Sequence, residues 1–148
     1  MRLWAWTLAV YERPGVPQAC LTLQDEYGLS TAFLLWAVWA KRADSQSLAT
    51  GASLAKSWET SVLIPTRGVR RWLKTTLPSM DDLAREALRN QVKSMELDAE
   101  RLLMESLEHL TPPVSEHHTL LACLRAAAKA WGVHNADNAL QGLADAMD

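Results

Sequence analysis

The sequence predicts an all-α protein, folded as a single compact helical bundle of irregular or orthogonal arrangement. Apolar residues recur every three or four positions along nearly the whole chain, which is the spacing of one helix face, and no stretch resembles a strand. Residues 32–40 are apolar at every position, which favours a central helix buried on all sides. Residues 79–110 carry the longest uninterrupted helical pattern and predict one long helix.

The 148 residues fit one domain, because a chain of this length can bury roughly two thirds of its unfolded surface around one core. We expect the single helical domain to span residues 1–148, with the core in residues 3–110 and a helical extension in residues 113–148. The composition, 49% hydrophobic and 22% charged, is that of an ordinary globular domain rather than a disordered chain.

Two short helices are expected before the central one. Trp4, Leu8 and Tyr11 share one face of the first helix, which ends before Gly15. The second helix closes at Gly28, and its inward residues are Val16, Cys20, Leu23 and Tyr27. The first ten residues are not interpreted as a signal peptide, because no small-residue cleavage pattern follows them.

Ser30 or Thr31 can cap the central helix by accepting a backbone hydrogen bond, and Lys41 and Arg42 follow its last turn, where the helix dipole favours cations. Its apolar run is less than half of the ~20 residues that span a bilayer. We therefore expect the protein's own core, and not a membrane, to cover this segment.

A fourth helix is expected over residues 48–62, although Gly51 weakens its pattern. Pro65 disfavours helical geometry at Ile64, which predicts a break or kink there. A short fifth helix follows, with Val69, Trp72 and Leu73 on one side. The inward stripe expected for the long helix is Ala84, Leu88, Val92, Met95, Ala99 and Leu102.

Two helices are expected after the long one. The first ends at Gly132, and the second, short and terminal, starts near Asn135. The inward residues of the first are Leu120, Leu124, Ala127 and Trp131.

A formal net charge of −2 excludes a globally basic nucleic-acid binder and leaves room for a local basic face. The two cysteines, Cys20 and Cys123, lie in apolar helical patterns without metal or redox spacing, so we expect buried free thiols. Free thiols suit a reducing compartment, and we expect a cytoplasmic protein.

Four cations, Arg67, Arg70, Arg71 and Lys74, share one helical face, with Trp72 and Leu73 turned away from it. Guanidinium groups bind phosphates and carboxylates, so this basic face is the candidate contact site for a macromolecular partner, with a protein favoured over nucleic acid. Two other interpretations stay open: a solvated face, or a face docked on the acidic start of the long helix at residues 81–86.

Catalytic and metal-binding patterns are weak. His117 and His118 are adjacent, and neighbouring helical side chains point about 100° apart, so they do not readily chelate one ion. No nucleophile elbow or phosphate loop occurs. We expect no cofactor or metal, and the sequence favours a non-enzymatic protein over an enzyme.

Two alternatives remain. A small-molecule-binding protein or enzyme would have its pocket among the N-terminal helices, near Tyr11, Asp25, Trp36 and Trp39. A homodimer would form through the long helix, whose apolar stripe widens near its end at Leu102, Leu103, Leu107 and Leu110.

Several stretches resemble an uncharacterised proteobacterial family, domain of unknown function 2390. They include Trp4 and Trp6 followed by residues 11–16, residues 19–25, and Leu34, Leu35, Trp39 and Trp58. They continue through Pro65 and Arg67, Arg70 to Lys74, and residues 92–101. The resemblance covers roughly residues 3–105 and implies a bacterial, cytosolic, helical protein without a known activity. The tail beyond Pro113 has no counterpart in it.

Overall fold

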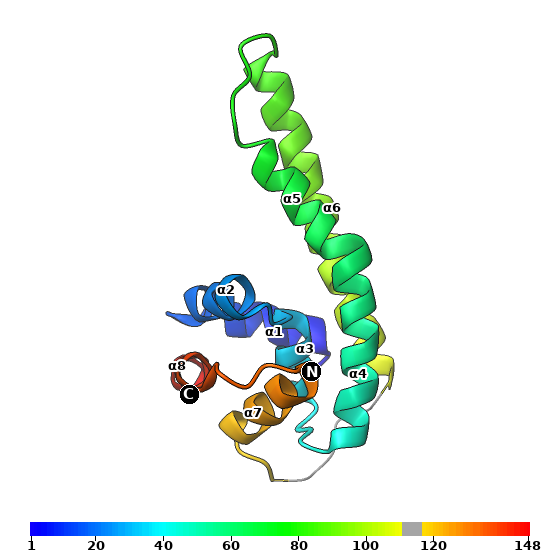
Figure 1. Cartoon of the computed structure of the whole chain (residues 1–148), viewed down its shortest axis with the longest axis vertical. Coiled ribbons are helices and arrows are strands. Elements are labelled where there is room, and N and C mark those ends of the chain that lie inside the picture. The colour runs from blue at the N-terminus through cyan, green and yellow to red at the C-terminus, as the bar shows by residue number, and fades with distance from the viewer. Residues whose placement is uncertain (111–116) are drawn as a thin grey trace.

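The computed structural model describes residues 1–110 and 117–148, and within them every regular element is a helix (Figure 1). The all-α prediction is therefore confirmed. The elements are α1 (Leu3–Tyr11), α2 (Val16–Tyr27), α3 (Thr31–Trp39), α4 (Ser45–Trp58), the π-helix η1 (Glu59–Leu63), α5 (Ile64–Trp72), α6 (Asp82–Leu110), α7 (Leu120–Trp131) and α8 (Asp137–Met147).

The central helix is α3, and its burial agrees with the sequence. Its side chains from Thr31 to Ala37 are buried, and Phe33 and Trp36 are both fully buried. The hydroxyl of Ser30 accepts a hydrogen bond from the backbone N–H of Phe33 (3.2 Å), which caps the helix as expected. Helices α1, α4, α6 and α7 surround α3, so the apolar run is covered by the protein itself.

The C-terminal helices pack on the same body. α7 lies against α3 and α4, and α8 lies along α2. Arg13, in the turn between α1 and α2, donates a hydrogen bond to the carbonyl of Met147. Residues 120–147 therefore share the core of the N-terminal helices.

The sequence predicts a break or kink at Ile64, just before Pro65. The helix is not broken there, because the backbone stays helical from Ser45 to Trp72. The turn just before the proline is π-helical, from Glu59 to Leu63. A wider turn accommodates the missing N–H of Pro65 and its ring, and the Thr66 hydroxyl donates to the carbonyl of Val62 (2.6 Å). α4 is thereby continued into α5.

Candidate functional site

A two-helix arm extends from the body, as Figure 1 shows. We define the arm as residues 64–96, which comprise α5, its connection to α6 and the N-terminal half of α6. The connection between the arm helices is polar. Arg85 donates to the carbonyl of Leu73 (2.5 Å), and Arg70 forms an ion pair with Glu96 (2.6 Å). Arginine side chains thus join the two helices of the arm.

The basic face lies on the side of the arm that faces the body. Arg67 is only 7% exposed and sits among three carboxylates, those of Glu59 (2.8 Å), Glu96 (3.5 Å) and Glu100 (3.5 Å). Arg70 is bound by Glu96. Arg67 is therefore buried and Arg70 is half-buried, and carboxylates of η1 and α6 neutralise both.

The other two cations are exposed. Arg71 pairs with Asp25 of α2 at 3.1 Å, and Lys74 lies beyond the end of α5. The carboxylates that form ion pairs with the basic face are therefore not the ones expected at residues 81–86. Asp82 and Glu86 instead pair with Arg85.

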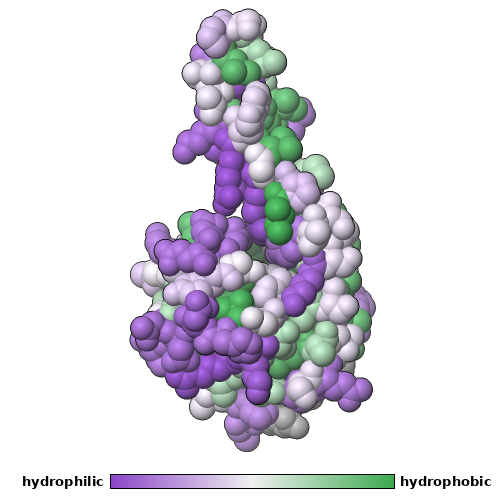
Figure 2. Space-filling model, viewed as in Figure 1, coloured by the Kyte–Doolittle hydropathy of each residue, from purple (hydrophilic) through white to green (hydrophobic). Residues whose placement is uncertain are grey.

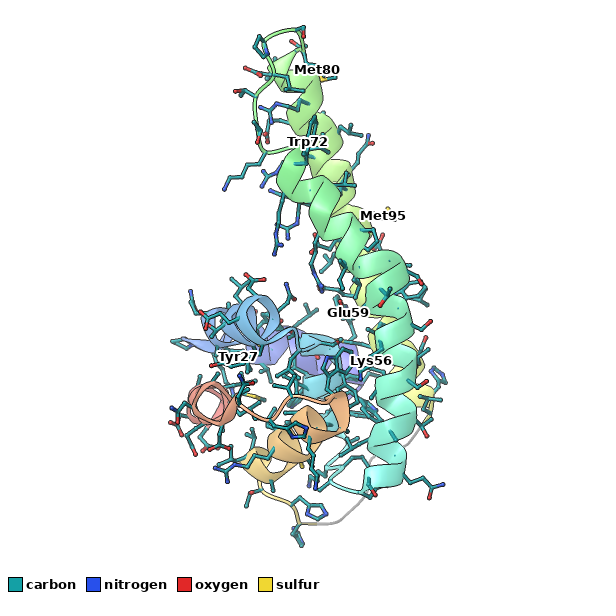
Figure 3. The ribbon with its side chains drawn as sticks, viewed as in Figure 1. Tyr27, Lys56, Glu59, Trp72, Met80 and Met95 are labelled. Atoms are coloured by element: carbon teal, nitrogen blue, oxygen red, sulfur yellow. The ribbon has the colours of Figure 1, made fainter. Side chains whose placement is uncertain are left out.

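Four exposed apolar residues of the arm lie on its outer side, away from the basic face, whereas Ile64 lines the cleft beside α2. Val69 and Trp72 on α5 are 50% and 61% exposed, and Leu88 and Met95 on α6 are 49% and 55% exposed. Figure 2 shows apolar surface following the arm and hydrophilic surface where the arm faces the body, and Figure 3 shows Met95 pointing away from the body. We call Val69, Trp72, Leu88 and Met95 the outer apolar side.

One sequence-based orientation is therefore wrong, that of the long helix. In the predicted inward stripe of the long helix, Ala84, Leu88, Met95 and Leu102 are exposed, Val92 is half-buried and Ala99 is buried. The reason is the arm itself, where α5 lies beside this part of α6 and the side chains of Arg85 and Arg89 donate to the carbonyls of Leu73 and Arg70.

The four residues of the predicted N-terminal pocket do not converge on one site. Trp36 fills the core, and the indole N–H of Trp39 donates to the carbonyl of Met1 (3.0 Å). Asp25 pairs with Arg71 across a shallow cleft between α2 and the arm. Tyr11 alone lines an apolar cavity, and Arg67 of the basic face lines the same cavity.

Tyr11 and Cys20 perturb each other's titration inside the body. Burial raises the pKa of Tyr11 well above its usual value, and the nearby Cys20 adds to this rise. Burial also raises the pKa of the Cys20 thiol, to about 11. Cys123 is buried too, and both cysteines are free, as predicted.

We expect neither native cysteine to react quickly with a disulfide reagent such as Ellman's reagent at pH 8. The reactive species is the thiolate, and burial both removes access and keeps the thiols protonated. Two equivalents of reacted thiol per chain should appear only after denaturation. An added exposed cysteine, Ser94→Cys, should react at once in the native protein. A rapid equivalent in the unmodified native protein would contradict the assigned burial.

Within residues 1–110 and 117–148, no three His, Cys, Asp or Glu side chains are grouped as a metal site would require. His117 is exposed, whereas the neighbouring Glu116 lies outside the described residues. Among the helices of the described segments, none has the length and apolar character of a membrane span.

Sequence reasoning missed the carboxylates that bind Arg67. Glu59 is 6% exposed, which is rare for a glutamate without a partner. Glu96 and Glu100 are one helical turn apart, so their spacing could have indicated a shared acidic face on the long helix. Nothing in the local sequence connects that face to Arg67, because the contact joins separate helices.

Comparison with known proteins gives one match. A family model described as a protein of unknown function (DUF2390) matches residues 2–107. No curated protein and no solved structure matches the chain. The matched range includes the arm and all the carboxylates around Arg67, whereas α7 and α8 lie beyond it.

Proposed function

Since the chain belongs to the DUF2390 family of proteins of unknown function, its role must be inferred from its surfaces, and we propose a non-enzymatic protein that binds another protein through the arm. The outer apolar side carries this proposal. Large apolar side chains that gather on a projecting element are typical of a binding surface, whereas scattered single ones are ordinary. The arm's own arginine contacts leave these side chains available to a partner.

The spacing along α6 favours a helical partner. Leu88, Val92 and Met95 follow one another at four- and three-residue steps. This is the alternation that packs one helix against another as knobs into holes. A partner helix with an apolar stripe fits this side of the arm.

The basic face takes a smaller part in this proposal than the sequence suggested. Arg67 and Arg70 neutralise internal carboxylates, so only Arg71 and Lys74 remain exposed enough to meet an acidic partner. Reversing the charge of Arg70 would also remove its ion pair with Glu96 inside the arm. Arg71→Glu with Lys74→Glu is therefore the cleaner test of a basic contact.

We expect a photo-crosslinking residue at position 95 to yield a discrete crosslinked protein in the native host. The same residue in place of Leu21, which is 54% exposed on α2, should yield none. Leu88→Glu should lower the yield at position 95 at least tenfold, because a charge at the centre of an apolar contact removes its main favourable interaction.

Leu88→Glu should leave the unfolding free energy within about 0.5 kcal/mol of the wild type, because the replaced side chain is half exposed. An undiminished crosslink in a folded Leu88→Glu protein would end the proposal. If Arg71→Glu with Lys74→Glu instead abolished the crosslink, the basic face would carry the binding.

A homodimer through the long helix is the second candidate. Leu103 and Leu107 of the predicted contact are buried in the body, so that part of the prediction is wrong, and the contact would use the exposed Leu88 and Met95. In an antiparallel two-fold pair centred midway between Leu88 and Met95, each Leu88 faces Met95 of the second copy. Light scattering distinguishes a homodimer from a complex with a different protein. A dimer mass that Leu88→Glu converts to a monomer mass would identify the second copy as the partner.

We further propose a cytosolic location in a bacterial host. Two free, buried thiols suit a reducing compartment. Fractionation of the host with an antibody to the chain tests this, and recovery in the periplasmic fraction would exclude it.

A further inference from the structure

A cavity of about 230 Å³ lies where the arm joins the body. Its apolar wall is formed by Trp4, Leu8, Leu63, Leu97 and Met104. Its polar groups come from separate elements: Tyr11 of α1, Glu59 of η1, Arg67 of α5 and Glu100 of α6. Figure 3 shows Glu59 at this junction. Apolar walls with a few convergent polar groups are the usual composition of a small-ligand site.

The charges around this cavity do not balance. Glu59, Glu96 and Glu100 face the guanidinium groups of Arg67 and Arg70, which leaves one negative charge in excess. Glu59 binds Arg67 and Glu96 binds Arg70 at short distance, whereas Glu100 has only a 3.5 Å approach to Arg67. Glu100 is therefore the carboxylate with capacity for another cation.

Burial raises the pKa of Glu100, and the neighbouring carboxylate of Glu96 also raises it, whereas Arg67 opposes the shift. A second cation beside Glu100 would relieve this unfavourable environment.

Thr7 supplies an independent observation. It is 3% exposed, lines the cavity, and its hydroxyl oxygen has no hydrogen-bond partner within the described protein. A buried hydroxyl without a partner costs free energy, so such groups are rare away from sites that receive a ligand or water. The adjoining π-helical turn, η1, is also a type of irregularity found often at functional sites.

We propose that this cavity binds a small organic cation, an amine that carries one apolar ring or short chain, with its ammonium group on Glu100. The apolar part contacts Trp4, Leu97 and Met104, and the Thr7 hydroxyl accepts or donates the remaining hydrogen bond. An apolar cavity of about 150 Å³ accommodates benzene, so this one suits a ligand of about ten non-hydrogen atoms. The site is separate from the outer apolar side of the arm.

An anionic ligand fits the same cavity poorly. Among the residues that the structure describes, Arg67 is the only cation that lines it, and three carboxylates already surround that guanidinium. A carboxylate or phosphate would approach Glu100 without an available counterion, and like charges at short distance repel. The charge of the ligand is therefore the decisive property.

The test uses two probes of similar size and opposite charge, 2-phenylethylammonium and 3-phenylpropionate, titrated into the full chain. The readouts are calorimetry and the NMR resonance of the Trp4 indole N–H, which is identified by its loss in Trp4→Phe. The ammonium probe should bind and shift the Trp4 resonance, whereas 3-phenylpropionate should do neither.

Glu100→Gln should weaken binding of the ammonium probe at least tenfold, and Asp98→Asn, which removes a charge from an exposed position on the same helix, should not. Leu97→Lys should block binding as well, because it places an ammonium group one helical turn from Glu100. Leu97 is 52% exposed, so this variant keeps the test valid if Glu100→Gln does not fold.

Binding that depends on Glu100 and Leu97 but not on Asp98 would establish the site. No ammonium binding, equal losses in Glu100→Gln and Asp98→Asn, or tighter binding of 3-phenylpropionate would each overturn the proposal.

Discussion

Replacing Arg67 with methionine is expected to destabilise the protein by about 3–5 kcal/mol, because it leaves a buried carboxylate without its partner. Arg67 and Glu59 are 7% and 6% exposed, and their side chains are 2.8 Å apart. Methionine keeps most of the apolar stem of arginine, so the loss of unfolding free energy measures the removal of the charge and not the creation of a cavity. Urea unfolding followed by circular dichroism measures it.

The matched control is Arg71→Met. Arg71 also pairs with a carboxylate, that of Asp25, but both side chains are about half exposed. Such pairs contribute about 0–1 kcal/mol because water solvates the separated charges. Equal losses in Arg67→Met and Arg71→Met would contradict the assigned burial of Arg67.

A double variant tests the reason for the loss. Glu59→Leu combined with Arg67→Met removes both buried charges, and we expect it to recover a large part of the stability that Arg67→Met loses. The recovery should stay incomplete, because Glu96 and Glu100 also approach Arg67. If the two substitutions were additive, the pair would not be coupled and the explanation would be wrong.

The example of Arg67 shows where sequence reasoning reached its limit. The helical spacing of Arg67, Arg70, Arg71 and Lys74 placed them on one face, but spacing cannot tell whether solvent or a neighbouring helix meets that face. Arg67 is buried because Glu59 and two carboxylates of α6 surround it. Those contacts join separate elements and leave no local pattern.

The central helix was predictable for the opposite reason. Residues 32–40 are apolar on every side, which predicts burial on every side, and α3 is buried from Thr31 to Ala37, whereas Val38 and Trp39 near its end are half-buried. Leu88 and Met95 sit in an equally regular apolar stripe, yet they are exposed. An amphipathic stripe predicts that something covers it, but not that the cover belongs to the same chain.

Gly51→Ala is expected to destabilise the protein by about 1–3 kcal/mol, although alanine is the better helix former. Gly51 lies inside α4, where the ring of Trp36 packs directly on its backbone. A Cβ atom at this position would be 2.4 Å from Cζ3 and 2.8 Å from Cη2 of Trp36. Trp36 is fully buried in the core, so its ring cannot move aside without disturbing α3.

The matched control is Gly142→Ala in α8. A Cβ atom there would meet nothing within 4 Å, and the residue is exposed. Only helix propensity acts at this position, so we expect a gain of about 0.5–1 kcal/mol. The same substitution should therefore have opposite signs at the two glycines, which urea unfolding of both variants measures.

Combining Gly51→Ala with Trp36→Phe identifies the cause. A phenylalanine ring is smaller and leaves room for the added methyl group, so the alanine should cost much less in the Trp36→Phe background than in the wild type. An equal cost in both backgrounds would locate the strain elsewhere. If the prediction holds, the glycine that weakened the helical pattern of residues 48–62 is the residue that lets α4 approach the central tryptophan.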